Sequence, residues 1–220
     1  MLQPGWSVEA IKRIGDSAVK LMAMYHPEAP IAARQEEVIA GVAEACRQHD
    51  IAFLLEPMSY PLEPGQKKSD PAFAARKPEM VLETVRRLAP LGADVLKLEF
   101  PTEPAYETDE QKMLSVCRQI TELAGMPWVL LSAGVEFATF QRQVEIACEA
   151  GASGFLAGRA IWQEAMQLRN PTEREHFLQT VAVSRLRILV QIATYRATPW
   201  LERIALDRWP QPQEGWFEGY

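Results

Sequence analysis

The segment Asp94–Pro101 (DVLKLEFP) places one lysine, Lys97, in the middle of an apolar, strand-like run. Burial disfavours a charged ammonium, so a lysine that points into such a strand is expected to give up its proton readily. The neutral amine can then attack a carbonyl carbon and form a Schiff base. The alternative is a structural lysine on an edge strand whose ammonium reaches water.

Three further ionisable residues, Lys20, Glu56 and Glu99, lie in or beside strand-like runs. Residues two apart in a strand share a face, so Lys97 and Glu99 are expected to point the same way. Each charge could belong to a structural ion pair. Together they indicate a site, because buried charges persist when they are paired or functional. Lys20 would favour the neutral form of the nucleophile by like-charge repulsion, and Glu56 or Glu99 would transfer protons.

Two later segments suit the binding of a phosphate group. The fourth strand-like run ends in Ser132-Ala133-Gly134, and the fifth ends in Gly158-Arg159, which opens directly into a helix. Small residues with exposed amides at a helix N-terminus accept anions, and the arginine adds a forked donor. Ordinary turn chemistry is the alternative explanation for both glycines.

Short apolar runs alternate with longer amphipathic stretches, as in a parallel sheet whose two faces are covered by helices. The predicted strands are 17–25, 51–56, 93–100, 127–133 and 153–157. The predicted helices are 8–14, 31–48, 78–91, 110–124, 137–150, 160–169 and one from Pro171 to about Arg196. We expect one domain over residues 1–198, followed by a tail over 199–220 that is rich in proline and in the aromatics Trp200, Trp209, Trp216, Phe217 and Tyr220.

Five strands are too few to close an eight-stranded barrel. The α/β pattern therefore leaves two architectures open. One is an open, doubly wound sheet, and the other is the C-terminal five-eighths of a TIM (β/α)8-type barrel.

The composition excludes several classes of function. The net charge of −6 argues against nucleic-acid and anionic-membrane partners, and no apolar run is long enough to span a bilayer. The three cysteines are scattered, which fits a reduced, cytoplasmic protein, and no signal peptide is recognised at the start. His26, His49 and His176 lack metal-ligand spacing. We expect no metal and no other cofactor.

The chain resembles the class I aldolases of the tagatose-1,6-bisphosphate aldolase family, which includes the sulfofructose-phosphate aldolases. The resemblance spans roughly Ser17 to Met166. Its matching segments are AVKL at 18–21, FLLE at 53–56, DVLKLE at 94–99, LSAGV at 131–135 and GASGFLAGRAIW at 151–162. Two short segments, MPW at 126–128 and GFLA at 154–157, look somewhat closer to the sulfosugar branch.

The resemblance implies a metal-independent barrel enzyme that cleaves a ketose bisphosphate, or a related ketose phosphate, into dihydroxyacetone phosphate and an aldehyde. It implies that Lys97 forms the Schiff base and that Glu56 transfers protons. The expected substrate-binding residues are Lys20, Glu99, Ser132, Gly134, Gly158 and Arg159. The expected partner is a small-molecule sugar phosphate, and assembly into a homo-oligomer is left open.

The sequence departs from the family in its length. It starts at what looks like the fourth strand of the barrel, and the family's first three strands would carry further substrate contacts. Three explanations are open: a fragment or misassigned start of an intact enzyme, a truncated sugar-phosphate-binding homologue without activity, and a barrel completed by another chain.

Overall fold

The computed structural model describes residues 5–204 and Gly215. Five parallel strands form one sheet: β1 (Ala18–Met24), β2 (Ala52–Met58), β3 (Val95–Leu98), β4 (Trp128–Leu131) and β5 (Phe155–Leu156). Their order in the sheet is β1-β2-β3-β4-β5, the order of the sequence. The five predicted strands are therefore confirmed, and β1 and β5 form the two edges.

Helices connect the strands and cover one side of the sheet. They are α1 (Val8–Arg13), α2 (Ala32–Gln48), α3 (Pro71–Leu88), α4 (Glu110–Ala124), α5 (Phe137–Glu149), α6 (Arg159–Trp162), α7 (Pro171–Phe177) and α8 (Val183–Arg196). Short 3-10 helices follow at η1 (Ala89–Leu91), η2 (Gln163–Gln167) and η4 (Trp200–Arg203), and a π-helical segment, η3 (Leu178–Ala182), joins α7 to α8.

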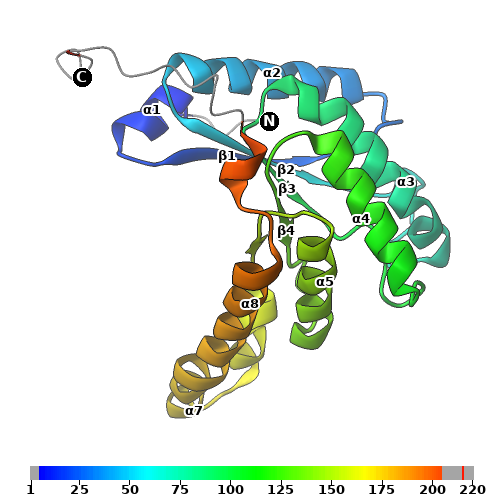
Figure 1. Cartoon of the computed structure of the whole chain (residues 1–220), viewed down its shortest axis with the longest axis vertical. Helices are drawn as coiled ribbons and strands as arrows, with labels where there is room; N and C mark the ends of the chain where they lie inside the picture. Colours follow the sequence, from blue (N-terminus) through cyan, green and yellow to red (C-terminus); the bar gives the residue numbers. More distant parts are fainter. Residues whose placement is uncertain (1–4, 205–214, 216–220) are drawn as a thin grey trace.

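The sequential strand order decides between the two architectures. A doubly wound sheet needs a point where the strand order reverses, and no such reversal occurs among the described strands. Right-handed crossovers between successive neighbours put each helix on the same face. Figure 1 shows α2, α3, α4, α5 and α8 following one another around the outside of the sheet. The fold is that of five consecutive βα units of a barrel, and the expectation of helices on both faces was wrong.

The third helix begins earlier than predicted. Its first turn starts at Pro71, and Pro78 lies inside the helix rather than at its start. Proline suits a first helical turn because it lacks the amide hydrogen that would be unpaired there, and Asp70 precedes it as the N-cap. The predicted tail begins with η4, whereas Trp209, Trp216, Phe217 and Tyr220 lie outside the described residues. The division at residue 198 stays a prediction.

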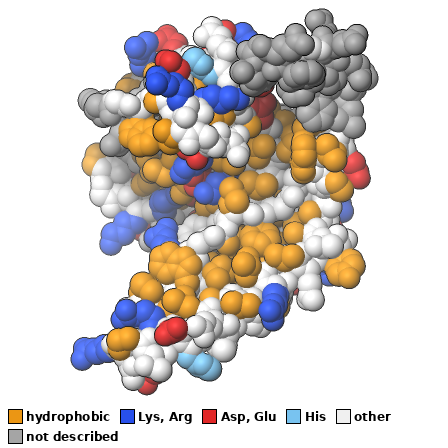
Figure 2. Space-filling model, turned by 90° about the vertical axis from the view of Figure 1, so that its left-hand side faces the viewer, with side chains coloured by type: hydrophobic (Ala, Val, Ile, Leu, Met, Phe, Trp, Pro, Cys, Tyr) orange, Lys and Arg blue, Asp and Glu red, His pale blue; other side chains and the backbone are white. Residues whose placement is uncertain are grey.

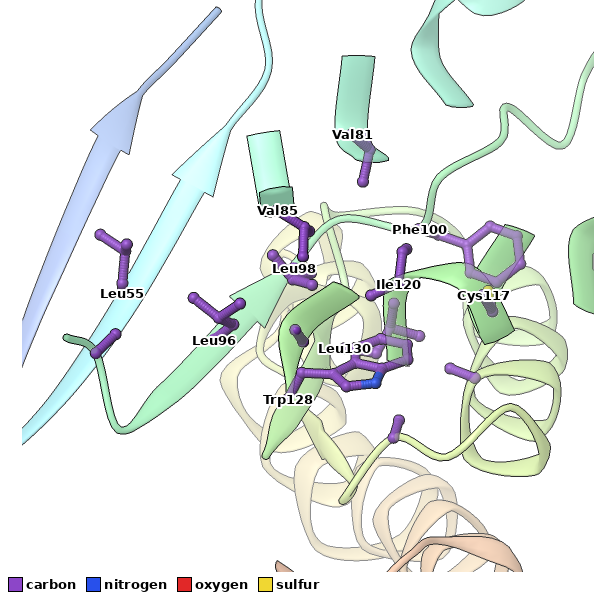
Figure 3. Packing of buried hydrophobic residues seen from close by; sticks show 14 of the residues in the cluster. Leu55, Val81, Val85, Leu96, Leu98, Phe100, Cys117, Ile120, Trp128 and Leu130 are labelled. Atoms are coloured by element: carbon purple, nitrogen blue, oxygen red, sulfur yellow. The ribbon is translucent and has the colours of Figure 1, made fainter. Parts of the chain in front are cut away.

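The main core lies between the sheet and these helices. On β3 the buried residues Leu96 and Leu98 alternate with half-buried Val95 and Lys97, so one face of the strand points to the helices. Figure 3 shows the packing of buried residues in this core, with Val81, Val85, Cys117 and Ile120 among them. The cysteines Cys46, Cys117 and Cys148 are buried and carry no disulfide.

Within residues 5–204, no helix covers the other, bare face of the sheet, which carries exposed apolar side chains. Met22 is 55% exposed, Met24 47% and Leu156 43%. Further exposed apolar residues, Val183, Leu186 and Val190, lie on α8. Figure 2 shows apolar side chains across the middle of the molecule and along the lower arm that contains α7 and α8. Because the bare face also carries apolar residues, the strand sequences resemble those of a sheet covered by helices on both faces.

Among the described residues, the structure holds no helix long and apolar enough to cross a membrane.

The position of the core leads to a stability prediction. Replacing fully buried Leu96 by alanine should lower the free energy of unfolding by about 2–5 kcal/mol, because the contacts of a packed side chain are lost. The matched control is Met22→Ala on the bare face, which should change it by about 0.5 kcal/mol or less. Urea unfolding followed by circular dichroism measures both. Equal losses would contradict a core confined to the helix-covered face.

Candidate active site

The bare face of the sheet brings three of the predicted residues together. Met22 of β1 is in register with Glu56 of β2, and Lys20 lies two residues before Met22, on the same face. The pairing of Leu54 with Val95 and of Leu55 with Leu96 brings Glu56 level with Lys97 of β3. Lys20, Glu56 and Lys97 therefore project from three adjacent strands on the side opposite the helices.

Glu56 lies between the two lysines. Its Oε2 accepts a hydrogen bond from Lys20 Nζ at 2.9 Å, and its Oε1 lies 2.9 Å from Lys97 Nζ. The exposed fraction of the side chain is 9% for Glu56, 18% for Lys97 and 51% for Lys20. The amine of Lys97 is therefore mostly withdrawn from water, and a carboxylate lies within proton-transfer reach of it.

The two lysines control the charge of Glu56. Burial by itself would raise the pKa of this carboxyl, because it disfavours the charged form. The hydrogen bonds and positive charges of Lys20 and Lys97 outweigh that effect and hold the pKa of Glu56 below its ordinary value. Glu56 is consequently a carboxylate at neutral pH, ready to accept a proton.

Glu99 belongs to a separate network. Its side chain is 4% exposed, and its Oε2 accepts hydrogen bonds from the backbone N–H of Ser59 at 2.6 Å and from Ser59 Oγ at 2.7 Å. Its Oε1 accepts from Lys68 Nζ at 2.5 Å. The structure thus brings Glu99 to Ser59 and Lys68, whereas Glu56 is the carboxylate beside Lys97. The predicted contact between Glu99 and a substrate stays a prediction.

The loop after β4 has an unusual backbone. Ala133 and Gly134 both have positive φ angles, 50° and 77°, directly after the buried residue Ser132. A non-glycine residue in the left-handed region is strained, and such strain is concentrated at functional sites. Sequence reasoning singled out Ser132 and Gly134 but missed the conformation of Ala133, for which an alanine gives no signal.

Arg159 lies beside this loop. A Cβ atom added at Gly134 would lie 3.1 Å from Arg159 Cζ, so the guanidinium packs directly against the glycine. Arg159 is the first residue of α6, and Gly158 is its N-cap. The structure therefore brings together Gly134 and the Gly158–Arg159 segment from the loops after β4 and β5.

Two residues of the Glu99 network were missed by sequence reasoning. Ser59 follows β2 directly, three residues after Glu56, and nothing in its surroundings distinguishes it from an ordinary turn serine. Lys68 belongs to the loop between β2 and α3, and nothing in the sequence around it distinguishes it from an ordinary loop lysine. Both could be recognised only through their contact with Glu99.

The described part of the chain contains no group of three or more His, Cys, Asp or Glu side chains placed to hold a metal ion.

The charge state of Glu56 predicts a pH dependence of stability. A carboxyl whose pKa is lowered by folding contributes stability above its unfolded pKa, about 4.3, and loses it as the pH falls through the folded value. The excess stability of the wild type over Glu56→Gln should thus be largest near pH 7 and shrink below about pH 4.3. Urea unfolding at several pH values measures the difference. A pH-independent difference would contradict the ionised state.

Comparison with known proteins identifies the family. The model of the DeoC/LacD family aldolase matches residues 2–164. Tagatose 1,6-diphosphate aldolase 2 of Streptococcus mutans is 26% identical over 219 residues, covering 91% of this chain and 66% of the relative. Tagatose 1,6-diphosphate aldolase 1 of Streptococcus pyogenes is 28% identical over 217 residues, covering 90% of this chain and 66% of the relative. The chain thus spans about two thirds of the length of these relatives.

Solved structures support the fold. A Schiff-base-forming fructose-1,6-bisphosphate aldolase is similar with a TM-score of 0.60 and 22% identity, over 86% of this chain and 63% of that one. The fructose-bisphosphate aldolase of Plasmodium falciparum is similar with a TM-score of 0.66 and 13% identity, over 87% of this chain and 61% of that one. The resemblance seen in the sequence is confirmed: the chain belongs to the DeoC/LacD aldolase family.

Proposed function

We propose that this chain carries the active site of a class I aldolase, a lyase that cleaves a ketose phosphate through a Schiff base on Lys97. The observation that carries the proposal is the Lys97 amine, mostly buried and 2.9 Å from the carboxylate of Glu56. A nucleophilic amine with a proton acceptor at this distance is what imine formation requires.

The arrangement supports each step of such a cleavage. Glu56 takes a proton from the Lys97 ammonium, and the neutral amine attacks the ketone carbon. The carbinolamine hydroxyl receives that proton from Glu56 and leaves as water, which gives an iminium ion. The iminium withdraws electrons from the carbon–carbon bond one carbon further along the chain, while Glu56 takes the proton of the hydroxyl on the far carbon of that bond. The bond breaks into an aldehyde and an enamine, which is then protonated on carbon, and water releases the ketone product from Lys97.

The loops after β4 and β5 are proposed to hold the phosphate nearest the ketone. Ser132, Gly134, Gly158 and Arg159 would provide amides, a hydroxyl and a guanidinium for its oxygens. These loops follow the two strands beyond β3, so a substrate anchored there can present its ketone carbon to Lys97. Lys20, on the other side of Glu56, would contact the hydroxyl-bearing part of the sugar.

The names of the relatives favour tagatose 1,6-bisphosphate, which would give dihydroxyacetone phosphate and glyceraldehyde 3-phosphate. A sulfofructose phosphate is the alternative, favoured by the segments MPW at 126–128 and GFLA at 154–157. A sugar-phosphate-binding homologue without activity is a second candidate, because the sheet formed by the described residues has five strands and two open edges.

Trapping of the imine tests the proposal. Incubation with dihydroxyacetone phosphate and borohydride should attach the reduced ketone covalently to Lys97, and peptide mass spectrometry should locate the adduct. Lys97→Met should abolish it, because the nucleophile is gone, and Glu56→Gln should slow it by about 100-fold, since proton transfer contributes that much.

Controls separate the candidates. Lys12→Met removes a partly exposed lysine of α1, whose ammonium contacts Asp50 just before the start of β2, and should leave the yield unchanged. Chelation with EDTA should also have no effect. An adduct that persists in Lys97→Met would disprove the assignment of the nucleophile, whereas binding of dihydroxyacetone phosphate without any adduct would favour the inactive homologue.

A glycine substitution tests the phosphate loops. Gly134→Ala should raise the dihydroxyacetone phosphate concentration needed for half-maximal trapping by about tenfold, because the new methyl group would push Arg159 away. Gly65→Ala is the matched control: its φ of 82° imposes similar strain, but nothing lies within 4 Å of the added atom. Equal effects of the two variants would attribute the loss to strain rather than to Arg159.

A further inference from the structure

Glu56 and Lys97, the reactive pair, lie on neighbouring strands, β2 and β3. The junction between these two strands is called the seam. Strand β2 is in register with β1 over seven residue pairs, from Ala18–Ala52 to Met24–Met58. The register of β2 with β3 comprises two pairs among the described residues, Leu54 with Val95 and Leu55 with Leu96. Glu56 is thus held by the β1–β2 ladder, whereas Lys97 is paired with Val129 in the β3–β4 ladder. The backbone pairing across the seam stops one residue before Glu56 and Lys97.

On both sides of this pair, a side-chain carboxylate forms hydrogen bonds across the seam. Towards the start of the strands, Asp94 Oδ2 accepts the backbone N–H of Phe53 at 2.7 Å, and the Asp94 N–H donates to the Phe53 carbonyl at 2.9 Å. Towards their carboxyl ends, Glu99 accepts both the backbone N–H and the hydroxyl of Ser59. Each carboxylate belongs to the β3 side and bonds to the β2 side, as a ladder carbonyl would.

The two carboxylates differ in their exposure to solvent. Asp94 is exposed, whereas Glu99 is 4% exposed and Ser59 5%. Glu99 lies two residues beyond Lys97, or about 6–7 Å along the chain, and Ser59 lies three residues beyond Glu56. Glu99 therefore closes the seam next to the reactive pair, at the end of the strands where barrel enzymes bind their substrates.

We propose that Glu99 is a positioning residue. By holding Ser59, it keeps the end of β2 against β3 and so fixes the separation between the Glu56 carboxylate and the Lys97 amine. Lys68 binds the other oxygen, so three donors already occupy the buried carboxylate. The proposal rests on the proposed function, and it assigns Glu99 to the support of the site in place of the substrate contact expected from the sequence.

Graded variants test this role by trapping with dihydroxyacetone phosphate and borohydride. Glu99→Ala removes the acceptor, and the rate of adduct formation at saturating ligand should fall by about tenfold or more, while the half-saturating concentration stays within about twofold. Ser59→Ala removes the hydroxyl but keeps the backbone N–H, so its rate should be intermediate. Glu99→Gln keeps an oxygen acceptor for Ser59 and should restore the rate to within about threefold of the wild type.

Lys68→Met is the matched control, because it breaks the ion pair on the same carboxylate and leaves the bonds to Ser59 in place. Its rate should also stay within about threefold of the wild type, because the two hydrogen bonds from Ser59 to Glu99 remain. A raised half-saturating concentration with an unchanged saturating rate in Glu99→Ala would indicate direct substrate contact and overturn the proposal. Losses in Glu99→Gln and Lys68→Met as large as that of Glu99→Ala would overturn it too, by showing that charge matters.

Hydrogen exchange of backbone amides, followed by nuclear magnetic resonance, tests the same role without the reaction. Removing Glu99 should speed exchange at Ser59 by about tenfold or more, whereas the amide of Phe53, which is bound to Asp94, should keep its protection. Unchanged protection at Ser59 in a folded Glu99→Ala would overturn the proposal. If Glu99→Ala does not fold, Ser59→Ala and Glu99→Gln supply the comparison in both assays.

Different results would reject the aldolase function and the positioning role of Glu99. Absence of any adduct in the wild type would reject the proposed function, and the exchange result would then decide whether Glu99 fastens the seam. An adduct on Lys97 that forms equally well in the wild type and in Glu99→Ala would leave the proposed function standing and reject the positioning role.

Discussion

The site depends on one interaction, the placement of a buried carboxylate between two lysines. A charge removed from water is costly unless partners of opposite charge compensate it, and Glu56 has one ammonium on each oxygen. These three residues constrain three strands at once, because Lys20, Glu56 and Lys97 belong to β1, β2 and β3. The same contacts that make the charges tolerable bring a proton acceptor to the amine that would form the imine.

The sheet supports this arrangement through its topology. Parallel strands in sequential order place the helices on one face and leave the other face free for polar side chains. The helix-covered face contains the apolar core, with Leu55, Leu96 and Leu130 fully buried. The stability of the fold and the chemistry of the site are therefore supplied by alternate residues of the same strands, as in the interior and exterior of a barrel.

The open edges and the bare face are both features that a closed barrel would not expose. A closed barrel has no edges, whereas here β1 and β5 each have one neighbour in the described sheet. The exposed Met22, Met24 and Leu156 lie on the bare face of the sheet, which would be the interior side of a closed barrel. The relatives are about half as long again as the aligned part of this chain.

Much of this protein could be predicted from local sequence patterns. The strands, most helices and the charged residues Lys20, Glu56, Glu99 and Lys97 follow from apolar periodicity, which depends on near neighbours alone. The local patterns left open which carboxylate meets Lys97, and only the family resemblance implied Glu56. The answer depends on the register between strands and on the loop that brings Ser59 and Lys68 to Glu99. Likewise, the sequence of an apolar strand does not show whether helices cover one face of the sheet or both. That is decided by the strand order and the handedness of the crossovers, which exist only in the folded sheet.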